Sequence, residues 1–166
     1  MDPDVRDVVS ALRRRRSGGQ ELLAWKEGRA WVDVDARVVN GFIKDHAGQE
    51  HSAKDFRTWH ATVLAAVGVA VAGWASSPTA RRRNEARAAK EVAHYLGNTP
   101  TVARNSYIDP RVFDRYRAGY TIGWVIDEIA DADSPQLAFH GPIEEAVVDL
   151  LTDHREADTV IKGPLL

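Results

Sequence analysis

The feature that most constrains the fold is an apolar run of 13 residues, VLAAVGVAVAGWA, which extends from Val63 to Ala75. It is shorter than the roughly 20 apolar residues that a membrane-spanning helix needs. A polar segment that begins at Ser52, SAKDFRTWHAT, precedes this run. The two together predict one long helix whose start lies at a surface or cleft and whose body runs through a core.

Capping residues, prolines and glycines divide the rest of the chain into shorter elements. The segment at about residues 21–34 alternates around Glu27-Gly28 and predicts a β-hairpin. We also expect helices from Pro3 to near Ser17, from Asp35 to Ala47, from about Thr79 to Leu96, from Thr99 through Tyr107, from Pro110 to Arg117 and from Ile143 to Leu151. The expected inward-facing side chains include Val38, Val39, Phe42 and Ile43 in the second of these helices and Ala86, Ala89, Val92 and Ala93 in the third. The predicted fold class is mostly α with one small hairpin.

Composition excludes several classes of site. The chain of 166 residues has no cysteine, so it has no disulfide, thiolate metal site or thiol nucleophile. Its six histidines show no spacing typical of metal ligands, and no metal site is expected. The N-terminal MDPDVRDVV lacks the basic and then apolar order of a signal peptide, so we expect a cytoplasmic protein.

Charge is distributed unevenly along the chain. Residues 1–117 carry 20 Lys and Arg against 14 Asp and Glu, a net charge of +6, whereas residues 118–166 carry 2 against 10, a net charge of −8. Arginines cluster at Arg13–Arg16 and Arg81–Arg83. Such runs either hold phosphates or form a solvated helix face, and the charge pattern leaves both interpretations open.

Three residues have properties that suit a phosphodiester site. Arg57 lies in the polar opening of the long helix, where a guanidinium needs an anionic partner; an internal ion pair is the ordinary alternative. Asn98 lies between a helix stop and a helix start, where asparagine also serves as a turn residue. Tyr107 follows nine residues later, and a lone tyrosine is more often a packing residue. Each residue alone is therefore weak evidence for a site.

The combination of motifs is more specific. SAKDFRTWHATVLAA, followed about forty residues later by LGNTPTVARNSYIDP, resembles the catalytic core of type IB DNA topoisomerases, in the eukaryote-like form of bacteria and large viruses. The upstream segment GGQELLAWKEGRAWVDVDARVVNGFIKDHAG is also similar to that family. The resemblance covers roughly residues 5–118, which we expect to form a partial catalytic core. Residues 119–166 would form an acidic C-terminal extension with one amphipathic helix.

The resemblance implies roles for specific residues. Tyr107 would match the nucleophile that attacks a DNA phosphate, expels a 5′-hydroxyl and becomes a 3′-phosphotyrosine. Arg57 would match the arginine that binds the non-bridging oxygens, and Asn98 would match a donor to the same phosphate. Reversal of the attack reseals the strand after rotation, so the resemblance implies relaxation of supercoils without ATP, metal or another cofactor. Further expected contacts with double-stranded DNA involve Lys54, Thr58, Arg104 and Asn105.

The sequence also departs from the family. The family has another catalytic arginine and a general-acid lysine upstream of these motifs, and neither has a counterpart here. We therefore expect an N-terminally truncated catalytic domain, associated with the nucleoid as a monomer, that is weak or inactive alone. A tyrosine recombinase is one alternative, although recombinases usually have histidine at the position of Lys54. A non-catalytic DNA-binding remnant is the other.

Overall fold

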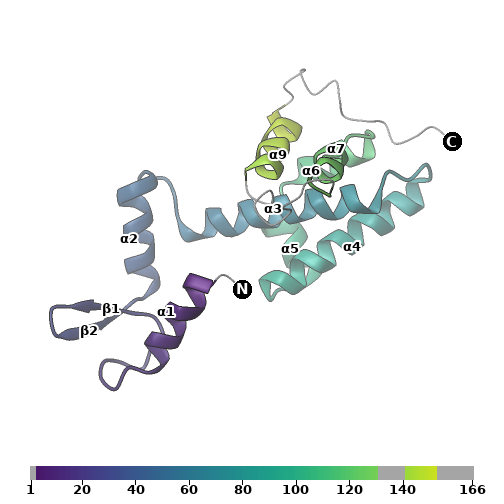
Figure 1. Ribbon diagram of the computed structural model, residues 1–166. Helices are drawn as coiled ribbons and strands as arrows, with labels where there is room; N and C mark the ends of the chain where they lie inside the picture. Colours follow the sequence, from purple (N-terminus) through teal and green to yellow (C-terminus); the bar gives the residue numbers. More distant parts are fainter. Residues whose placement is uncertain (1–2, 131–140, 153–166) are drawn as a thin grey trace. The chain divides into compact units, whose positions relative to one another are not determined.

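A computed structural model describes residues 3–130 and 141–152 of the chain. The chain forms two compact units, residues 1–55 (unit 1) and residues 56–166 (unit 2). Figure 1 shows helices throughout and one two-stranded antiparallel sheet. This arrangement confirms the predicted fold class for the described residues.

Unit 1 contains two helices, the hairpin and the first residues of a long helix. In the hairpin, Trp25 pairs with Val32 and Glu27 pairs with Ala30. The turn needs Gly28, whose φ of 59° lies in the left-handed region that other residues rarely adopt. The elements are α1 (Pro3–Arg13), β1 (Ala24–Glu27), β2 (Ala30–Asp33), α2 (Ala36–Ala47) and the start of α3 (Ala53–Ala72).

Packing in unit 1 is sparse. Among its described residues only Leu12 is buried. The expectation that Val38 and Phe42 face inward is wrong, because these side chains are 43% and 64% exposed. The Phe42 ring instead stacks on His46 with 4.1 Å between the ring centroids. Helical spacing placed the apolar residues of α2 near one another, but no neighbouring element of unit 1 covers them all.

The side chain of Arg15 organises part of unit 1. The Arg15 side chain is only 8% exposed and donates hydrogen bonds to the backbone oxygens of Leu22 (3.0 Å), Gly19 (3.2 Å) and Glu21. Its guanidinium also lies 3.4 Å from the Asp33 carboxylate. One member of the first arginine cluster is therefore a structural residue of this unit.

Unit 2 contains most of α3 and the remaining helices. Ser77, Thr99 and Asp109 each cap a helix whose first residue is proline. The elements are α4 (Pro78–Leu96), α5 (Pro100–Ser106), α6 (Pro110–Arg117), α7 (Gly123–Ala130) and α9 (Pro142–Thr152). The sequence did not predict α7. None of the helices in residues 3–130 and 141–152 is long and apolar enough to cross a membrane.

The core of unit 2 forms around the apolar body of α3. Ala61 and Ala65 are fully buried, and Gly68 lets α4 approach so closely that a Cβ atom there would lie 3.1 Å from the Cβ of Ala88. The prediction of a buried α3 is confirmed, whereas Ala86, expected to face the core, is exposed. The C-terminal α9 contributes five residues to this core, namely Ile143, Ala146, Val147, Leu150 and Leu151.

Candidate active site

The ends of three helices bring Arg57 and Tyr107 together, although 50 residues separate them in the sequence. The guanidinium carbon of Arg57 lies 5.3 Å from the centroid of the Tyr107 ring, within the range of a cation–π contact. Arg57 Nη2 also donates a 3.0 Å hydrogen bond to the carbonyl of Leu96, the last residue of α4. The Arg57 side chain is thus held beside the tyrosine by a carbonyl, without a carboxylate partner among the described residues.

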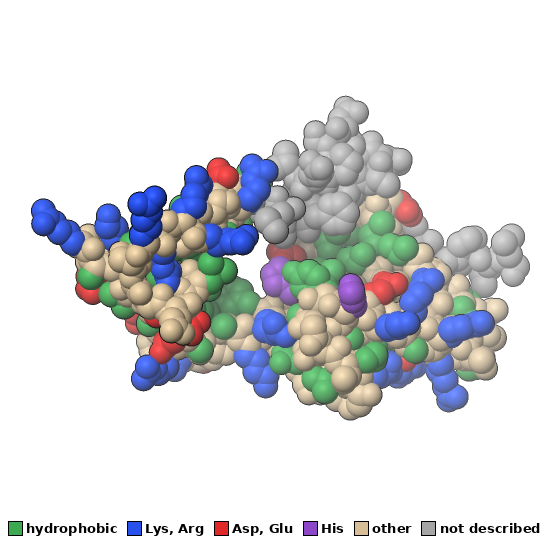
Figure 2. Space-filling model, turned by 90° about the horizontal axis from the view of Figure 1, so that it is seen from below, with side chains coloured by type: hydrophobic (Ala, Val, Ile, Leu, Met, Phe, Trp, Pro, Cys, Tyr) green, Lys and Arg blue, Asp and Glu red, His purple; other side chains and the backbone are tan. Residues whose placement is uncertain are grey.

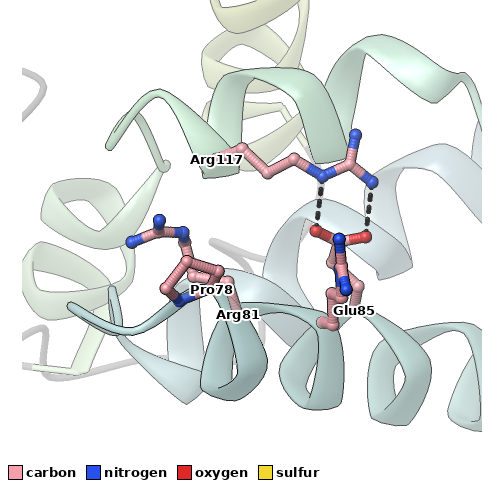
Figure 3. A pocket seen from close by; sticks show the side chains of 5 residues that line it. Pro78, Arg81, Glu85 and Arg117 are labelled. Atoms are coloured by element: carbon pink, nitrogen blue, oxygen red, sulfur yellow. Dashed lines mark hydrogen bonds and ion pairs between the residues drawn. The ribbon is translucent and has the colours of Figure 1, made fainter.

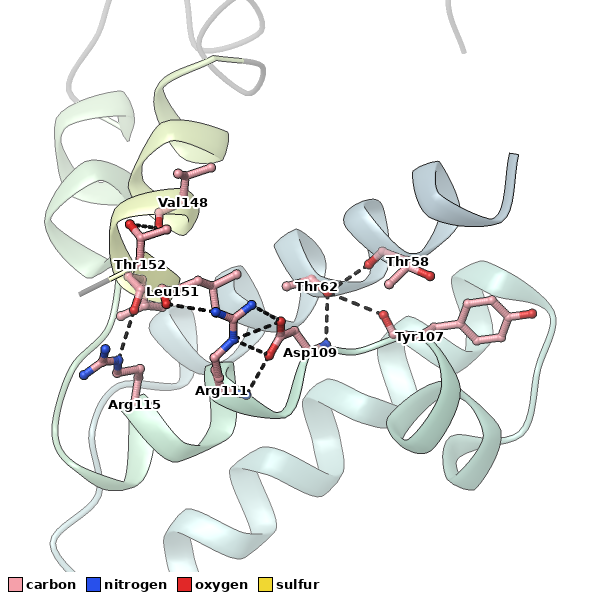
Figure 4. Close-up of polar contacts among 10 residues, drawn as sticks. Thr58, Thr62, Tyr107, Asp109, Arg111, Arg115, Val148, Leu151 and Thr152 are labelled. Atoms are coloured by element: carbon pink, nitrogen blue, oxygen red, sulfur yellow. Dashed lines mark hydrogen bonds and ion pairs between the residues drawn. The ribbon is translucent and has the colours of Figure 1, made fainter. Parts of the chain in front are cut away.

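The backbone of Tyr107 is fixed by a hydrogen bond, and its side chain is half-buried. It follows α5 directly, and its N–H donates a 3.1 Å hydrogen bond to the Ala103 carbonyl. The next residue, Ile108, is 4% exposed and anchors the segment in the core. Figure 4 shows the Tyr107 ring directed away from the neighbouring network of polar contacts. A fixed backbone and a half-buried phenol suit a nucleophile that must meet a large substrate.

Asn98 has an unusual environment for an amide. Gly97 ends α4 with a φ of 69°, and the Asn98 N–H then donates a 2.8 Å hydrogen bond to Ala93. Within the described residues, Asn98 Nδ2 is buried and has no hydrogen-bond partner. An unsatisfied buried donor costs about 1–3 kcal/mol, so such groups call for a specific explanation. A ligand with an acceptor oxygen would supply one.

Thr62, which the sequence analysis did not single out, connects the two sides of this site. It lies on α3 five residues after Arg57 and is 2% exposed. Its hydroxyl lies 2.8 Å from the Thr58 carbonyl oxygen, 3.1 Å from the Asp109 nitrogen and 3.4 Å from the Tyr107 carbonyl oxygen (Figure 4). A threonine at the end of the polar segment of this helix carries no distinctive sequence signal, and only the fold places it beside Tyr107.

The predicted DNA-contacting residues have different surroundings. Arg104 donates a 2.8 Å hydrogen bond to Glu85, and its guanidinium lies 4.4 Å from the Phe113 ring centroid. Asn105 is exposed and lines an open pocket of about 400 Å³ together with Arg104. Thr58 is half-buried, and Lys54 is exposed in the part of α3 that belongs to unit 1. Their contacts with DNA stay predictions, and Arg104 is also part of an internal ion pair.

A buried carboxylate supports the helices around the site. Glu85 is 2% exposed, and Arg117 binds both of its oxygens at 2.7 and 2.6 Å (Figure 3). Burial disfavours the charged form, but hydrogen bonds from Arg117 and Arg104 outweigh it, so the pKa of Glu85 lies below its ordinary value. In the sequence, Glu85 precedes Ala88 by three residues and Ala89 by four. This spacing places the carboxylate on the same helix face as the two buried alanines.

The second arginine cluster lies at the start of α4 in unit 2. Arg81 donates hydrogen bonds to the carbonyls of Ala75 and Ser76 at 2.7 and 2.9 Å, whereas Arg82 and Arg83 are exposed without a partner among the described residues. Figure 2 shows one face of the molecule, on which Lys and Arg side chains lie next to exposed hydrophobic side chains. The cluster is thus part structural and part solvated.

The C-terminal helix α9 is joined to the elements that carry the site. Arg111 and Arg115 of α6 donate 3.2 and 3.1 Å hydrogen bonds to the carbonyls of Leu151 and Leu150. Trp59, two residues after Arg57, donates a 3.1 Å hydrogen bond to Glu144. These contacts place the described part of the predicted extension within unit 2.

Asp109, the N-cap of α6, pairs with Arg111. The shortest of their contacts joins Arg111 Nη2 to a carboxylate oxygen at 2.6 Å. The Arg111 guanidinium lowers the pKa of the Asp109 carboxyl, and Asp109 raises the pKa of Arg111. The turn that follows Tyr107 is therefore fixed by a charged pair that is itself bound to α9.

No group of three or more His, Asp or Glu side chains that could hold a metal ion occurs in the described part of the chain. Asp109, two residues after Tyr107, is instead paired with Arg111. The structure brings the Arg57 guanidinium beside the Tyr107 phenol, and Asn98 follows two residues after Leu96, whose carbonyl binds Arg57.

Comparison with known proteins gives the family. The sequence profile described as the eukaryotic DNA topoisomerase I catalytic core matches residues 1–126, which include Arg57, Asn98 and Tyr107. No curated protein matches the chain closely enough to count as a relative. Since the profile covers well over half of the sequence, the chain belongs to the eukaryotic-type DNA topoisomerase I family.

Proposed function

We propose that this chain cleaves and reseals one strand of duplex DNA through a covalent bond to Tyr107, and so relaxes supercoils. The phenol oxygen attacks the phosphorus atom and forms the new phosphoester bond, while the bond to the 5′-oxygen breaks. The phenol releases its proton to water, the departing 5′-oxygen takes up a proton from water, and the reverse reaction reseals the strand. The bond energy is kept in the 3′-phosphotyrosine, so the proposed reaction uses neither ATP nor a metal ion.

The observation that carries this proposal is the contact between Arg57 and Tyr107 at 5.3 Å. A guanidinium presents a planar fork of donors that matches the non-bridging oxygens of a phosphate. When the phosphate binds, Arg57 exchanges its weak contacts with the ring and the Leu96 carbonyl for a charged partner. Charge that develops on those oxygens in the transition state is then stabilised at the point of attack.

Asn98 supplies the second donor in this proposal. Its buried Nδ2 has no acceptor within the described residues, and a phosphate oxygen would satisfy it. Arg104, Asn105, Thr58 and Lys54 would contact the backbone on either side of the cleaved phosphate. The proposed partner is double-stranded DNA, bound by a monomer.

We expect cleavage of ordinary DNA by the chain alone to be slow, because none of the three proposed site residues, Arg57, Asn98 and Tyr107, is a general acid for the leaving 5′-oxygen. A missing general acid typically costs about 10²- to 10⁴-fold in rate. A substrate whose bridging 5′-oxygen is replaced by sulfur avoids this step, since a thiolate leaves without a proton. It therefore tests Tyr107, Arg57 and Asn98 without the acid.

The test is covalent adduct formation on a duplex with one bridging 5′-phosphorothiolate, measured on a denaturing gel. The wild-type chain should form an adduct with the 3′ end that the cut creates, and Tyr107→Phe should form none while binding DNA as before. Tyr95→Phe is the matched control, because Tyr95 is 66% exposed on α4. Binding by the wild type without any adduct would instead identify a non-catalytic DNA-binding remnant.

A further inference from the structure

The hydroxyl of Thr62 occupies a position that links the two reacting sides of the site. On one side it approaches the carbonyl of Thr58, which directly follows Arg57 in α3. On the other side it approaches the backbone of the segment that carries Tyr107, at the Asp109 N–H and the Tyr107 carbonyl (Figure 4). At 2% exposure, Thr62 is closed to bulk water and does not meet a substrate directly.

The chemistry of a hydroxyl explains how one side chain can serve both sides. It has a single proton to donate and lone pairs to accept hydrogen bonds. The shorter distance, 2.8 Å, assigns the proton to the Thr58 carbonyl rather than to the Tyr107 carbonyl at 3.4 Å. The oxygen then accepts the Asp109 N–H at 3.1 Å. A methyl group at this place could make neither bond.

The neighbouring anchors show why this bond matters for Tyr107. Before the tyrosine, its own N–H is bound to Ala103 at 3.1 Å, and after it Ile108 is buried. The bond from Asp109 to Thr62 ties the turn beyond Ile108 to α3, the helix that carries Arg57. The separation of the phenol from the guanidinium is therefore set partly through one hydroxyl.

We propose that Thr62 is a positioning residue that holds Tyr107 in line with the phosphate bound by Arg57, an inference that rests on the proposed strand-cleaving function. Reacting atoms must be placed closely, and a displacement of about 1 Å can cost about 100-fold in rate. Loss of the hydroxyl should therefore slow the attack by Tyr107 while leaving the contacts with DNA intact.

The alternative is that the Thr62 hydroxyl only stabilises helix α3, since threonine often donates a hydrogen bond to the carbonyl four residues earlier. The chain contains a matched control for this possibility. Thr152 on α9 makes the same bond to the Val148 carbonyl at 2.8 Å, and among the described residues its hydroxyl makes no hydrogen bond to the Tyr107 segment. Thr62→Val and Thr152→Val each remove one such helix bond, and only the first removes the acceptor of Asp109.

The experiment uses the full chain and the duplex with a bridging 5′-phosphorothiolate, in a single turnover with the protein in excess. We expect Thr62→Val to slow adduct formation about 10- to 100-fold, with the dissociation constant for DNA, measured by fluorescence anisotropy, unchanged. Thr62→Ser should restore most of the rate because it restores the hydroxyl. Thr152→Val should react like the wild type. An unchanged rate in Thr62→Val, or no rescue by Thr62→Ser, would overturn the proposal.

Hydrogen exchange gives a second readout that does not depend on cleavage. The Asp109 amide should exchange faster in Thr62→Val than in the wild type or in Thr152→Val, and slower exchange should return in Thr62→Ser. If the Asp109 amide is equally protected from hydrogen exchange in all variants, the hydrogen bond to Thr62 does not fix the segment that carries Tyr107. If the exchange result holds but the wild type forms no adduct, the proposed function fails and the catalytic part of this inference fails with it.

Discussion

The two units of the chain differ in what holds them together. Unit 2 has a continuous core in which Val112 and Val147, from α6 and α9, are fully buried. Unit 1 has one buried residue among those described, and Val8 and Phe42 are 58% and 64% exposed. Its loop and hairpin are organised by a buried guanidinium, that of Arg15. Unit 2 therefore has the packing to fix the Arg57 and Tyr107 geometry, whereas unit 1 depends more on polar contacts.

The strongest test of this comparison removes the buried charge of unit 2. Glu85→Ala should leave Arg117 and Arg104 without their shared carboxylate and lower the free energy of unfolding by about 3–5 kcal/mol. Chemical denaturation followed by circular dichroism measures this change. Glu91→Ala, which removes an exposed pair with Arg87 at 3.9 Å, should cost less than about 1 kcal/mol. Equal losses in the two variants would contradict a special role for Glu85.

The same substitution in both units compares their cores directly. Leu150→Ala in α9 removes a side chain that is 6% exposed and should destabilise the chain by about 2–5 kcal/mol. Leu23→Ala removes one that is 50% exposed and should change stability by about 0.5 kcal/mol or less. Thermal unfolding measures both. A similar fall in Tm for the two variants would show that unit 1 is packed in solution.

A fall in pH should lower the free energy of unfolding of unit 2, because Glu85 becomes protonated. Because the pKa of Glu85 is lower in the folded chain, its stabilising effect is complete above its ordinary value of 4.5 and is lost as the pH falls through the lower, folded value. The slope from this group reaches at most about 1.4 kcal/mol per pH unit. Unfolding free energies of wild type and Glu85→Gln between pH 7 and pH 3 should converge in acid. A constant difference across this range would contradict the assignment.

The smallest expected effect lies in unit 1. Arg15→Gln removes the hydrogen bonds to the backbone of residues 19–22 and should cost about 1 kcal/mol locally. Hydrogen exchange of residues 19–34 should become several-fold faster. Arg16→Gln is the control, because Arg16 is exposed and has no partner among the described residues. Unchanged exchange in Arg15→Gln would show that the hairpin does not depend on this arginine.

Local signals predicted the elements well. The caps at Asp35, Ser77 and Thr99 and the stops at Gly48 and Gly97 act within one helical turn, so the sequence near each boundary contains the needed information. The exposed positions of Val38 and Ala86 were not predictable in this way. Helical spacing identifies side chains that share a face, and coverage of that face depends on elements distant in the sequence.

The candidate site was predictable only in part. The two motifs pointed to Arg57, Asn98 and Tyr107, and the fold places the first and last of them 5.3 Å apart. Their catalytic roles stay predictions. Thr62 and Glu85 carry no motif, and their contacts arise from the packing of α3, α4 and α6.

The sequence by itself determined the hairpin, the helices other than α7, the buried body of α3 and the family, because these follow from local spacing, caps and an extended motif. Only the tertiary structure decided which apolar faces are covered, that Arg15 is structural and that α9 joins the core of unit 2. It also decided that a threonine hydroxyl ties Tyr107 to the helix of Arg57. These outcomes depend on contacts between distant segments, whose distances are set by side-chain packing across the whole unit.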